Sequence, residues 1–198
     1  MQMNSNKKQD TADKIMTAAI DLMAERGYNG VTTEEIATKA GFSEKTLFRH
    51  FKSKQNLLES AFHRYHYAEE MKDLFDKKIT WDLHTDLMMI SRNYHRIMHQ
   101  NRKLIQISGR ERENLPGFQE STHKHPQQLK EFLTEYFEEM YNKGKIIQTD
   151  PERQAVVFLY MHYGAATGRI NNDPILDAFS IEVFIEESVL IFTRALTP

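Results

Sequence analysis

The side chains in this sequence best suited to binding a ligand lie between positions 44 and 50. At helical spacing they form one outward face, which comprises Glu44, Lys45, Thr46, Phe48, Arg49 and His50. Lysine and arginine can donate hydrogen bonds to guanine, glutamate can accept one from the cytosine amine, and apolar groups can contact the thymine methyl. An ordinary solvated helix face would have the same composition, so this pattern alone leaves both interpretations open.

Two short helices must hold this face in place. Thr32 and Glu35 have the spacing of a capping box, which predicts that a helix starts at Thr32. Gly41 can adopt the left-handed backbone that ends a helix and turns the chain. Ser43 is a suitable N-cap for a second helix, whose apolar residues face the first. A helix, a glycine turn and a second helix form a helix-turn-helix.

A third helix is predicted to follow, with Ser53 as its N-cap and Lys52 and Lys54 on either side. The helix dipole opposes a lysine in the first turn, because that end already carries partial positive charge. A bound phosphate would account for the lysine, since free backbone N–H groups and a positive charge both attract anions.

The segment GFSEKTLFRHFKSKQNLL resembles the DNA-binding signature of the TetR (tetracycline repressor) family of bacterial transcriptional regulators. The likeness extends upstream through AERGYNGVTTEEIATKAG and, more weakly, downstream through NKGKIIQTDPERQAVVFLYMHYGAATGRI. The resemblance implies that the base-reading residues are Thr33, Glu44, Lys45, Phe48 and Arg49. It implies that the DNA backbone is held by Thr46, His50 and Lys54. Phe48 stands where the family most often has tyrosine, so only the stacking or methyl-contact part of that role carries over.

Composition and charge agree with a protein of this kind. The 198 residues are 40% hydrophobic and 27% charged, which is ordinary for a globular protein, and no apolar run could span a bilayer. The polar N-terminus lacks a signal-peptide core and there are no cysteines, so we expect a cytoplasmic protein. Residues 1–54 carry a net charge of +2 and the remainder −4, which places the positive balance with the predicted helix-turn-helix.

Apolar periodicity predicts an all-α chain without strands. We expect an N-terminal tail and helix-turn-helix domain over residues 1–54, joined by a connecting helix to a larger helical ligand-binding and dimerisation domain over 55–198. Residues 1–10 are predicted to be a loose tail, and the segment around residues 109–126 to be the least regular part of the body. The remaining helices are predicted at 11–26, from Lys54 to about Phe75, and at 82–100, 102–108, 127–142, 150–169 and 176–195.

Methionine and aromatic residues gather in the helices that should surround the interior of the larger domain. Ordinary core packing would explain any one of them, but in the TetR family this region encloses an effector, which here would be apolar or amphipathic. The predicted pocket residues are Met88, Met89, Tyr94, His95, Phe118, Phe132, Tyr136, Tyr160 and Tyr163. The polar groups expected to orient the effector are His95, His99 and Arg110.

The last helix is apolar on far more than one stripe, so the core of one subunit should not bury all of it. We expect the last two helices to pack against their counterparts in a second copy, unless the final helix lies centrally in a monomer. The predicted dimer interface comprises Ala155, Leu159, Ile181, Phe184, Ile185, Ser188 and Phe192.

The sequence gives little support for a metal site or an enzyme active site. His95 and His99, like the pairs 63/66 and 123/125, supply two ligands where a zinc site needs three or four, and H-E-x-x-H is absent. There is no G-x-S-x-G, phosphate-binding glycine loop or dinucleotide fingerprint, so we expect neither an enzyme nor a cofactor or metal.

The sequence therefore predicts a ligand-responsive transcriptional regulator, a repressor that binds a pseudo-palindromic operator in double-stranded DNA as a homodimer, with no membrane partner. Two alternatives remain open at this point. One is a TetR-like interaction protein that uses DNA as a platform, and the other is a helical metal-dependent enzyme.

Overall fold

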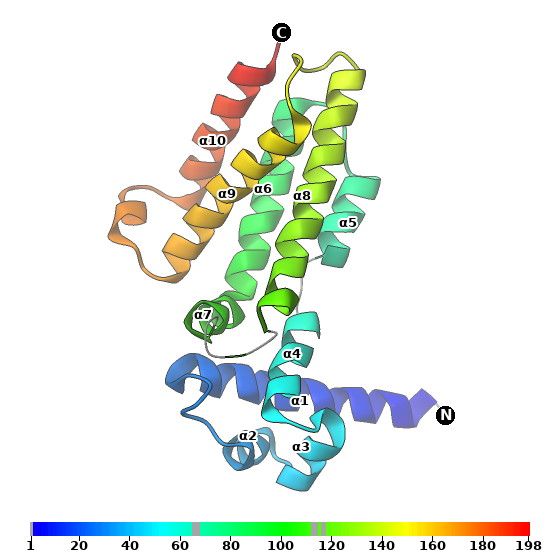
Figure 1. The fold of residues 1–198 in the computed structure, drawn as a ribbon, viewed down its shortest axis with the longest axis vertical. Helices are drawn as coiled ribbons and strands as arrows, with labels where there is room; N and C mark the ends of the chain where they lie inside the picture. Colours follow the sequence, from blue (N-terminus) through cyan, green and yellow to red (C-terminus); the bar gives the residue numbers. More distant parts are fainter. Residues whose placement is uncertain (1, 65–67, 112–114, 116–117) are drawn as a thin grey trace. The chain divides into compact units, whose positions relative to one another are not determined.

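The computed structural model describes residues 2–64, 68–111, 115 and 118–198, without the side chains of residues 2–8, 68 and 118–125. Over these residues the chain forms α-helices, one short 3-10 helix and no strand, which confirms the all-α prediction (Figure 1). By compactness the chain divides into two units. Unit 1 is residues 1–66 with 103–123, and unit 2 is residues 67–102 with 124–198. The functional division at residue 54 stays a prediction.

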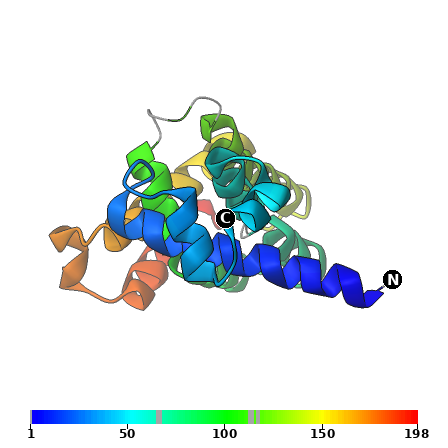
Figure 2. The ribbon, with the colours of Figure 1, turned by 90° about the horizontal axis from the view of Figure 1, so that it is seen from below.

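Five helices build unit 1: α1 (Gln2–Arg26), α2 (Thr33–Ala40), α3 (Glu44–Phe51), α4 (Lys54–Arg64) and α7 (Arg102–Glu111). In this unit α1 packs against α2, α3 and α4, and α3 packs against both α2 and α4 (Figure 2). The helices share one apolar core, to which each contributes at least one side chain: Ile15, Met23, Ile36, Leu47, Leu57 and Ile107.

The predicted helix ends of the helix-turn-helix are confirmed. Thr32 and Glu35 form the capping box, in which the Glu35 amide donates to Thr32 Oγ1 over 3.2 Å and the Thr32 amide donates to Glu35 Oε2 over 2.8 Å. Gly41 takes the left-handed conformation (φ 79°) that would strain any residue with a Cβ. Ser43 caps α3, and Ser53 accepts from the Asn56 amide at the start of α4.

Helix α1 begins at Gln2, so the prediction of a loose tail over residues 1–10 is wrong. No glycine or proline interrupts residues 2–26. Polar side chains one turn apart support the extension, with Lys14 Nζ 2.7 Å from Asp10 Oδ2 and Gln9 Nε2 3.3 Å from Asp13 Oδ1. The prediction counted apolar periodicity, which this polar extension of the helix lacks.

Unit 2 contains α5 (Ala68–Lys77), α6 (Leu83–Gln100), most of α8 (Phe118–Asn142), α9 (Pro151–Ile170), the 3-10 helix η1 (Pro174–Ala178) and α10 (Ile181–Leu196). Helix α6 packs against α5, α9 and α10 (Figure 1). Phe137, Leu87, Ile90 and Val189 are buried in its core. Asp82 and Asp150 cap α6 and α9, which begin within one residue of the starts predicted at 82 and 150.

Two helices begin at other residues than predicted, and a third predicted helix is only partly described. Helix α8 begins at Phe118 rather than 127, because Pro126 is accommodated inside the helix instead of starting it. The last helix begins at Ile181 rather than 176, because η1 precedes Ser180, whose side chain caps α10. The predicted connecting helix from Lys54 to about Phe75 crosses residues 65–67, which lie outside the described residues, so its continuity stays a prediction.

Four polar side chains are buried together between α6, α9 and α10. His95 Nε2 lies 3.0 Å from His162 Nδ1, and His162 Nε2 lies 3.2 Å from Ser91 Oγ and 3.5 Å from Ser188 Oγ. The ring of Phe158 lies 4.4 Å from that of His162, measured between centroids. Apolar packing therefore surrounds a small hydrogen-bonded network that the sequence did not indicate.

Burial keeps both histidines neutral at pH 7. It lowers the pKa of His95 to about 4, and the positive charge of Arg169 acts in the same direction. Burial also lowers the pKa of His162 to about 3, with His95 as the secondary cause. A neutral imidazole has one donor and one acceptor nitrogen, which allows the two rings to hydrogen-bond directly.

Acidification should therefore destabilise the protein through this pair. A histidine in the unfolded chain has a pKa near 6.5, so below that pH the unfolded state binds protons that the native state does not. The free energy of unfolding then rises with pH between the folded values and about 6.5. From pH 7 to pH 5 we expect the pair to lose about 2–4 kcal/mol of stability, measured by urea unfolding.

A double variant, His95→Gln with His162→Gln, should lose less stability over the same pH interval, because glutamine does not titrate. His84→Gln, which replaces an exposed histidine of α6, is the matched control. Equal pH dependence of the double variant and wild type would contradict the assignment.

Candidate nucleic-acid interface

Helix α3 presents its polar face outward because its apolar residues are held inside unit 1. Leu47 and Phe51 are buried in the core, so the positions between them point away from it. The side chains of Glu44, Lys45, Phe48 and Arg49 are exposed, and those of Thr46 and His50 are half-buried. Phe48 is 43% exposed, which is unusual for a large apolar ring and leaves it available for contact.

The basic side chains of this face are not neutralised internally. Within the described residues, Lys45, Arg49 and Lys52 form no ion pair, whereas nearby Arg26 contacts Glu35 over 2.9 Å. Lys39 on α2 lies 3.9 Å from Asp21, so it too has an acidic neighbour. In the described part of unit 1, α3 and the turn after it therefore carry three cationic side chains without an acidic partner.

Two of the predicted base-reading residues contact each other across the two helices. Thr33 Oγ1 on α2 donates a hydrogen bond of 2.6 Å to Glu44 Oε1 on α3. Glu44 is also at the first turn of α3, where the helix dipole favours a carboxylate. The bond fixes the direction of the Glu44 side chain, which makes it a positioned acceptor.

Lys54 has an internal role that the sequence did not indicate. Its ammonium donates to the carbonyl oxygens of Tyr28 and Val31, each over 2.8 Å, and lies 4.2 Å from the centroid of the Tyr28 ring. Desolvation lowers the pKa of Lys54, while the nearby Glu111 carboxylate opposes that shift. Two of its three donors thus hold the loop between α1 and α2.

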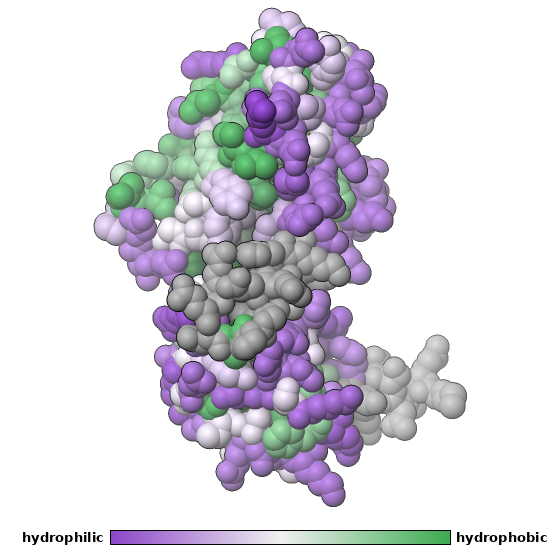
Figure 3. All heavy atoms as spheres, viewed as in Figure 1, coloured by the Kyte–Doolittle hydropathy of each residue, from purple (hydrophilic) through white to green (hydrophobic). Residues whose placement is uncertain are grey.

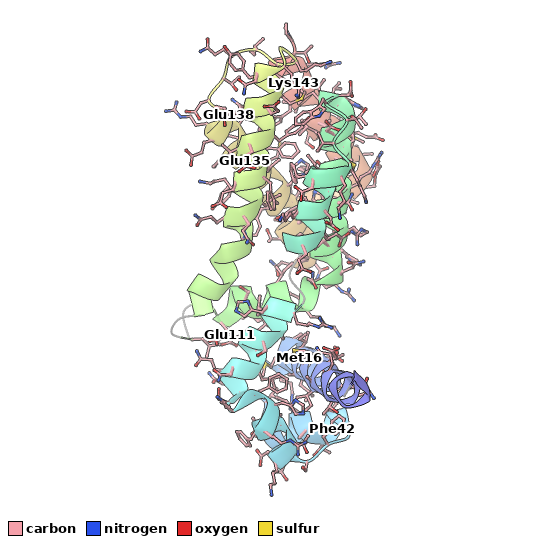
Figure 4. The ribbon with its side chains drawn as sticks, turned by 90° about the vertical axis from the view of Figure 1, so that its right-hand side faces the viewer. Met16, Phe42, Glu111, Glu135, Glu138 and Lys143 are labelled. Carbon is pink, nitrogen blue, oxygen red and sulfur yellow. The ribbon has the colours of Figure 1, made fainter. Side chains whose placement is uncertain are left out.

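Glu111 holds the same loop from α7 (Figure 4). Its carboxylate Oε1 accepts a hydrogen bond of 3.0 Å from the Tyr28 amide, and its side chain is buried. The loop that leads into α2 is therefore fixed by a cation from α4 and an anion from α7. Residues 28, 54 and 111 are far apart in sequence, so no local pattern could have revealed this arrangement.

The predicted pocket residues divide into several groups in the structure. Met88, Tyr94, His95 and Tyr136 are buried, and Met89 and Phe132 are half-buried. The side chain of Phe118 lies outside the described residues. Only Phe132 and Tyr136 line the described groove of unit 2, whereas His95 belongs to the histidine network.

Four other residues do not lie where the pocket prediction expected them. Tyr160 and Tyr163 are 66% and 41% exposed on the outer face of α9 and pack against each other, with ring centroids 6.1 Å apart. Their spacing on α9 turns both rings away from the core. His99 is exposed, and Arg110 donates to the Ala24 carbonyl in unit 1, so neither reaches the interior of unit 2.

The predicted dimer residues lie mostly inside the single chain, and their role at an interface stays a prediction. Ala155, Leu159, Ile185, Ser188 and Phe192 are buried, and Ile181 and Phe184 are half-buried. A side chain already removed from solvent has almost no surface to give to a partner. The opposite faces of α9 and α10 carry the exposed apolar residues: Val157, Tyr160, Tyr163, Val183 and Ile191. Figure 3 shows apolar surface gathered over these helices.

No described helix is both long and apolar enough to cross a membrane. No group of three or more histidine, aspartate or glutamate side chains in the described part of the chain could hold a metal ion.

Comparison with known proteins identifies the fold and its family. Residues 15–61, which span the helix-turn-helix and its flanking helices, match the family model "Bacterial regulatory proteins, tetR family". The chain is 30% identical over 188 residues to YvkB of Bacillus subtilis, an uncharacterized HTH-type transcriptional regulator, and the match covers 94% of this chain and 97% of YvkB.

A second curated relative and a solved structure are also similar to this chain. The chain is 24% identical over 151 residues to IcaR of Staphylococcus aureus, the negative transcriptional regulator of the biofilm operon icaADBC, with 75% of this chain and 79% of IcaR covered. The crystal structure of FadR from Bacillus subtilis, in complex with stearoyl-CoA, superposes with a TM-score of 0.75 at 18% identity, covering 92% of this chain and 97% of FadR.

The match to YvkB runs almost end to end in both chains, and the family model covers the same helices that present the unpaired basic face. The chain therefore belongs to the TetR family of bacterial regulatory proteins and is a helix-turn-helix transcriptional regulator, not an enzyme.

Proposed function

We propose that this protein is a cytoplasmic, ligand-responsive repressor that binds a pseudo-palindromic operator as a homodimer. The observation that carries the DNA-binding part is the unpaired basic face of α3, held rigidly by the core of unit 1. Repression is supported by IcaR, a negative regulator among its relatives. A two-fold dimer presents two such helices, which is the arrangement that a palindromic site requires.

Within this proposal, the residues of the interface have two kinds of task. Lys45, Phe48 and Arg49 are free to reach base edges, and Thr33 directs Glu44 toward the same surface. The DNA backbone is held by Thr46, His50 and Lys54. Lys54 then acts twice, because the ammonium that would contact a phosphate also fixes the loop before α2.

We infer that the dimer forms through the exposed apolar face of α9 and α10. Tyr160, Ile191 and Val157 are each more than half exposed, and single soluble chains seldom expose such a patch without a partner. Gly164 lies on the same part of α9, and nothing described lies within 4 Å of where its Cβ would be. A second copy could therefore approach this helix closely.

Base contacts can be tested with Lys45→Ala and Arg49→Ala. Each variant should lose about 1–3 kcal/mol of preference for the protein's own upstream DNA over random DNA, because a base contact discriminates between sequences. Fluorescence anisotropy at several salt concentrations measures both affinities. Lys145→Ala, which removes an exposed lysine of unit 2, is the control and should match wild type. Undiminished discrimination in both α3 variants would contradict the proposal.

Lys54→Ala should weaken binding to all sequences and lower the melting temperature. The lost phosphate contact should make the salt dependence shallower by about one unit per site. The two freed backbone carbonyls of the loop should reduce stability, since hydrogen bonds to a charged group are each worth roughly 1.5–3 kcal/mol. Unchanged melting and unchanged DNA affinity would contradict both roles.

The dimer face can be tested with Ile191→Asp and Tyr160→Asp. Both side chains are exposed in the single chain, so each variant should keep its helical circular dichroism, become monomeric by light scattering at micromolar concentration, and lose operator binding. Tyr141→Asp changes an equally apolar exposed residue of α8 and should remain dimeric. Ile185→Asp should instead unfold the protein, because Ile185 is 2% exposed.

A further inference from the structure

A groove with an aromatic wall lies in unit 2 between α5 and α8. Its volume is about 480 Å³, within the usual range for small-molecule sites. Phe75 from α5, Phe132 and Tyr136 from α8, and Trp81 from the loop before α6 line it. All four side chains belong to the same compact unit, so the groove does not depend on how the two units are placed.

The aromatic rings that line the groove pack against one another. Phe75 lies 5.5 Å from Phe132 and 6.3 Å from Tyr136, measured between ring centroids. Trp81 and Tyr136 are stacked, with centroids 6.0 Å apart and ring planes 12° from parallel. The groove therefore offers π faces and ring edges in a fixed arrangement and not a set of independent side chains.

A buried carboxylate holds the loop that carries Trp81. Asp86 is completely buried; its Oδ1 accepts from the Thr80 amide and hydroxyl over 2.9 and 2.8 Å. Its Oδ2 accepts from the Trp81 amide over 2.9 Å and from the Tyr136 hydroxyl over 3.2 Å. Trp81 has φ +63°, a conformation that a bulky residue adopts only when its surroundings impose it. Asp86 thus positions both stacked rings of the wall.

The charged residues of the groove are predominantly acidic. Asp76, Glu135 and Glu138 line it and make no ion pair with any described residue, whereas Lys72 is the one lining lysine. Figure 4 shows Glu135 and Glu138 along the second half of α8. Carboxylates beside aromatic faces favour a positively charged ligand and disfavour an anionic one.

One lysine of the protein itself already binds in this way, against an aromatic ring and a carboxylate. Lys143 Nζ lies 4.7 Å from the centroid of a Trp81 ring and 2.7 Å from Glu139 Oε1, another residue of the groove. The ammonium thus combines a cation–π contact with a carboxylate contact. Its side chain is long and partly exposed, so a better cation could displace it.

We propose that this groove binds a small organic cation with an aromatic or apolar body, and that this cation is the effector of the repressor. The cationic head lies between Trp81 and the carboxylates of α8, where Lys143 competes with it, and the apolar body lies against Phe75 and Phe132. The assignment as effector rests on the proposed function, whereas binding of the cation does not.

The protein carries a built-in reporter for this test, because Trp81 is its only tryptophan. Full-length protein is titrated with (4-phenylbutyl)trimethylammonium while Trp81 fluorescence is followed, and calorimetry gives the affinity. The neutral isostere, with tert-butyl in place of trimethylammonium, and the anion 5-phenylvalerate are titrated in parallel. We expect the cation to bind at least about tenfold more tightly than the neutral isostere, and the anion not to bind.

Two variants should change the affinity for the cation in opposite directions. Glu135→Gln with Glu138→Gln should weaken binding about two- to fivefold per carboxylate removed, and Lys143→Met should tighten it by a similar factor because a competing charge is lost. Glu131→Gln, an exposed charge one turn away on α8 that does not line the groove, is the matched control. Equal binding of the cation and its isostere, or no effect of the carboxylate and lysine variants, would overturn the proposal.

The effector role is decided by adding the same probe to the protein–DNA complex. Release of upstream DNA by the cation, reduced in the Glu135/Glu138 double variant, supports it. Cation binding with unchanged affinity for DNA would overturn the effector role alone. Wild-type protein that binds no DNA would overturn the proposed function instead, while the Trp81 titration would still decide what the groove binds.

Discussion

The contact between the Lys54 ammonium and the carbonyls of Tyr28 and Val31 fixes the part of unit 1 on which the recognition surface depends. These carbonyls belong to the loop between α1 and α2, which contains no α-helical residue. A backbone carbonyl without a partner is costly when it is partly buried, and a lysine satisfies two at once. Since α2 begins immediately after this loop, its direction relative to α4 follows from the contact, and α3 packs against both helices.

In unit 2 an anionic side chain, and not a cationic one, holds a loop in place. Asp86 accepts from two backbone amides of the loop before α6, just as Lys54 donates to two carbonyls in unit 1. In both units a side chain from a helix holds an irregular segment whose backbone groups would otherwise lack partners. The Glu111 carboxylate adds a third example, because it accepts from the Tyr28 amide. Charged groups in this protein thus serve backbone positioning as much as recognition.

The two candidate binding surfaces differ in how they keep their charges available. On α3 the lysine and arginine have no acidic partner in the described structure, which leaves positive charge for a phosphate or base. In the groove of unit 2 carboxylates are left without basic partners beside rigid aromatic rings. This division of charge would keep the proposed cation on a separate surface from the DNA, which carries the opposite charge.

The sequence by itself determined the elements whose signals are local. The capping box at Thr32, the turn at Gly41 and the cap at Ser43 each depend on residues a few positions apart, and the structure contains all of them. The outward face of α3 follows from helical periodicity in the same way. These features also carry the resemblance to the TetR family, which is why the family could be recognised from the sequence.

Only the tertiary structure decided which apolar faces lie inside. Helix α10 is apolar nearly all round, so periodicity could not tell Ile185, which is buried, from Ile191, which is exposed. Tyr160 and Tyr163 could not be separated from core aromatics for the same reason. The pairing of His95 with His162, and of Lys54 with Tyr28, joins residues distant in the chain. Local sequence records the periodicity of each helix, whereas the partner that each face meets depends on how all the helices pack together.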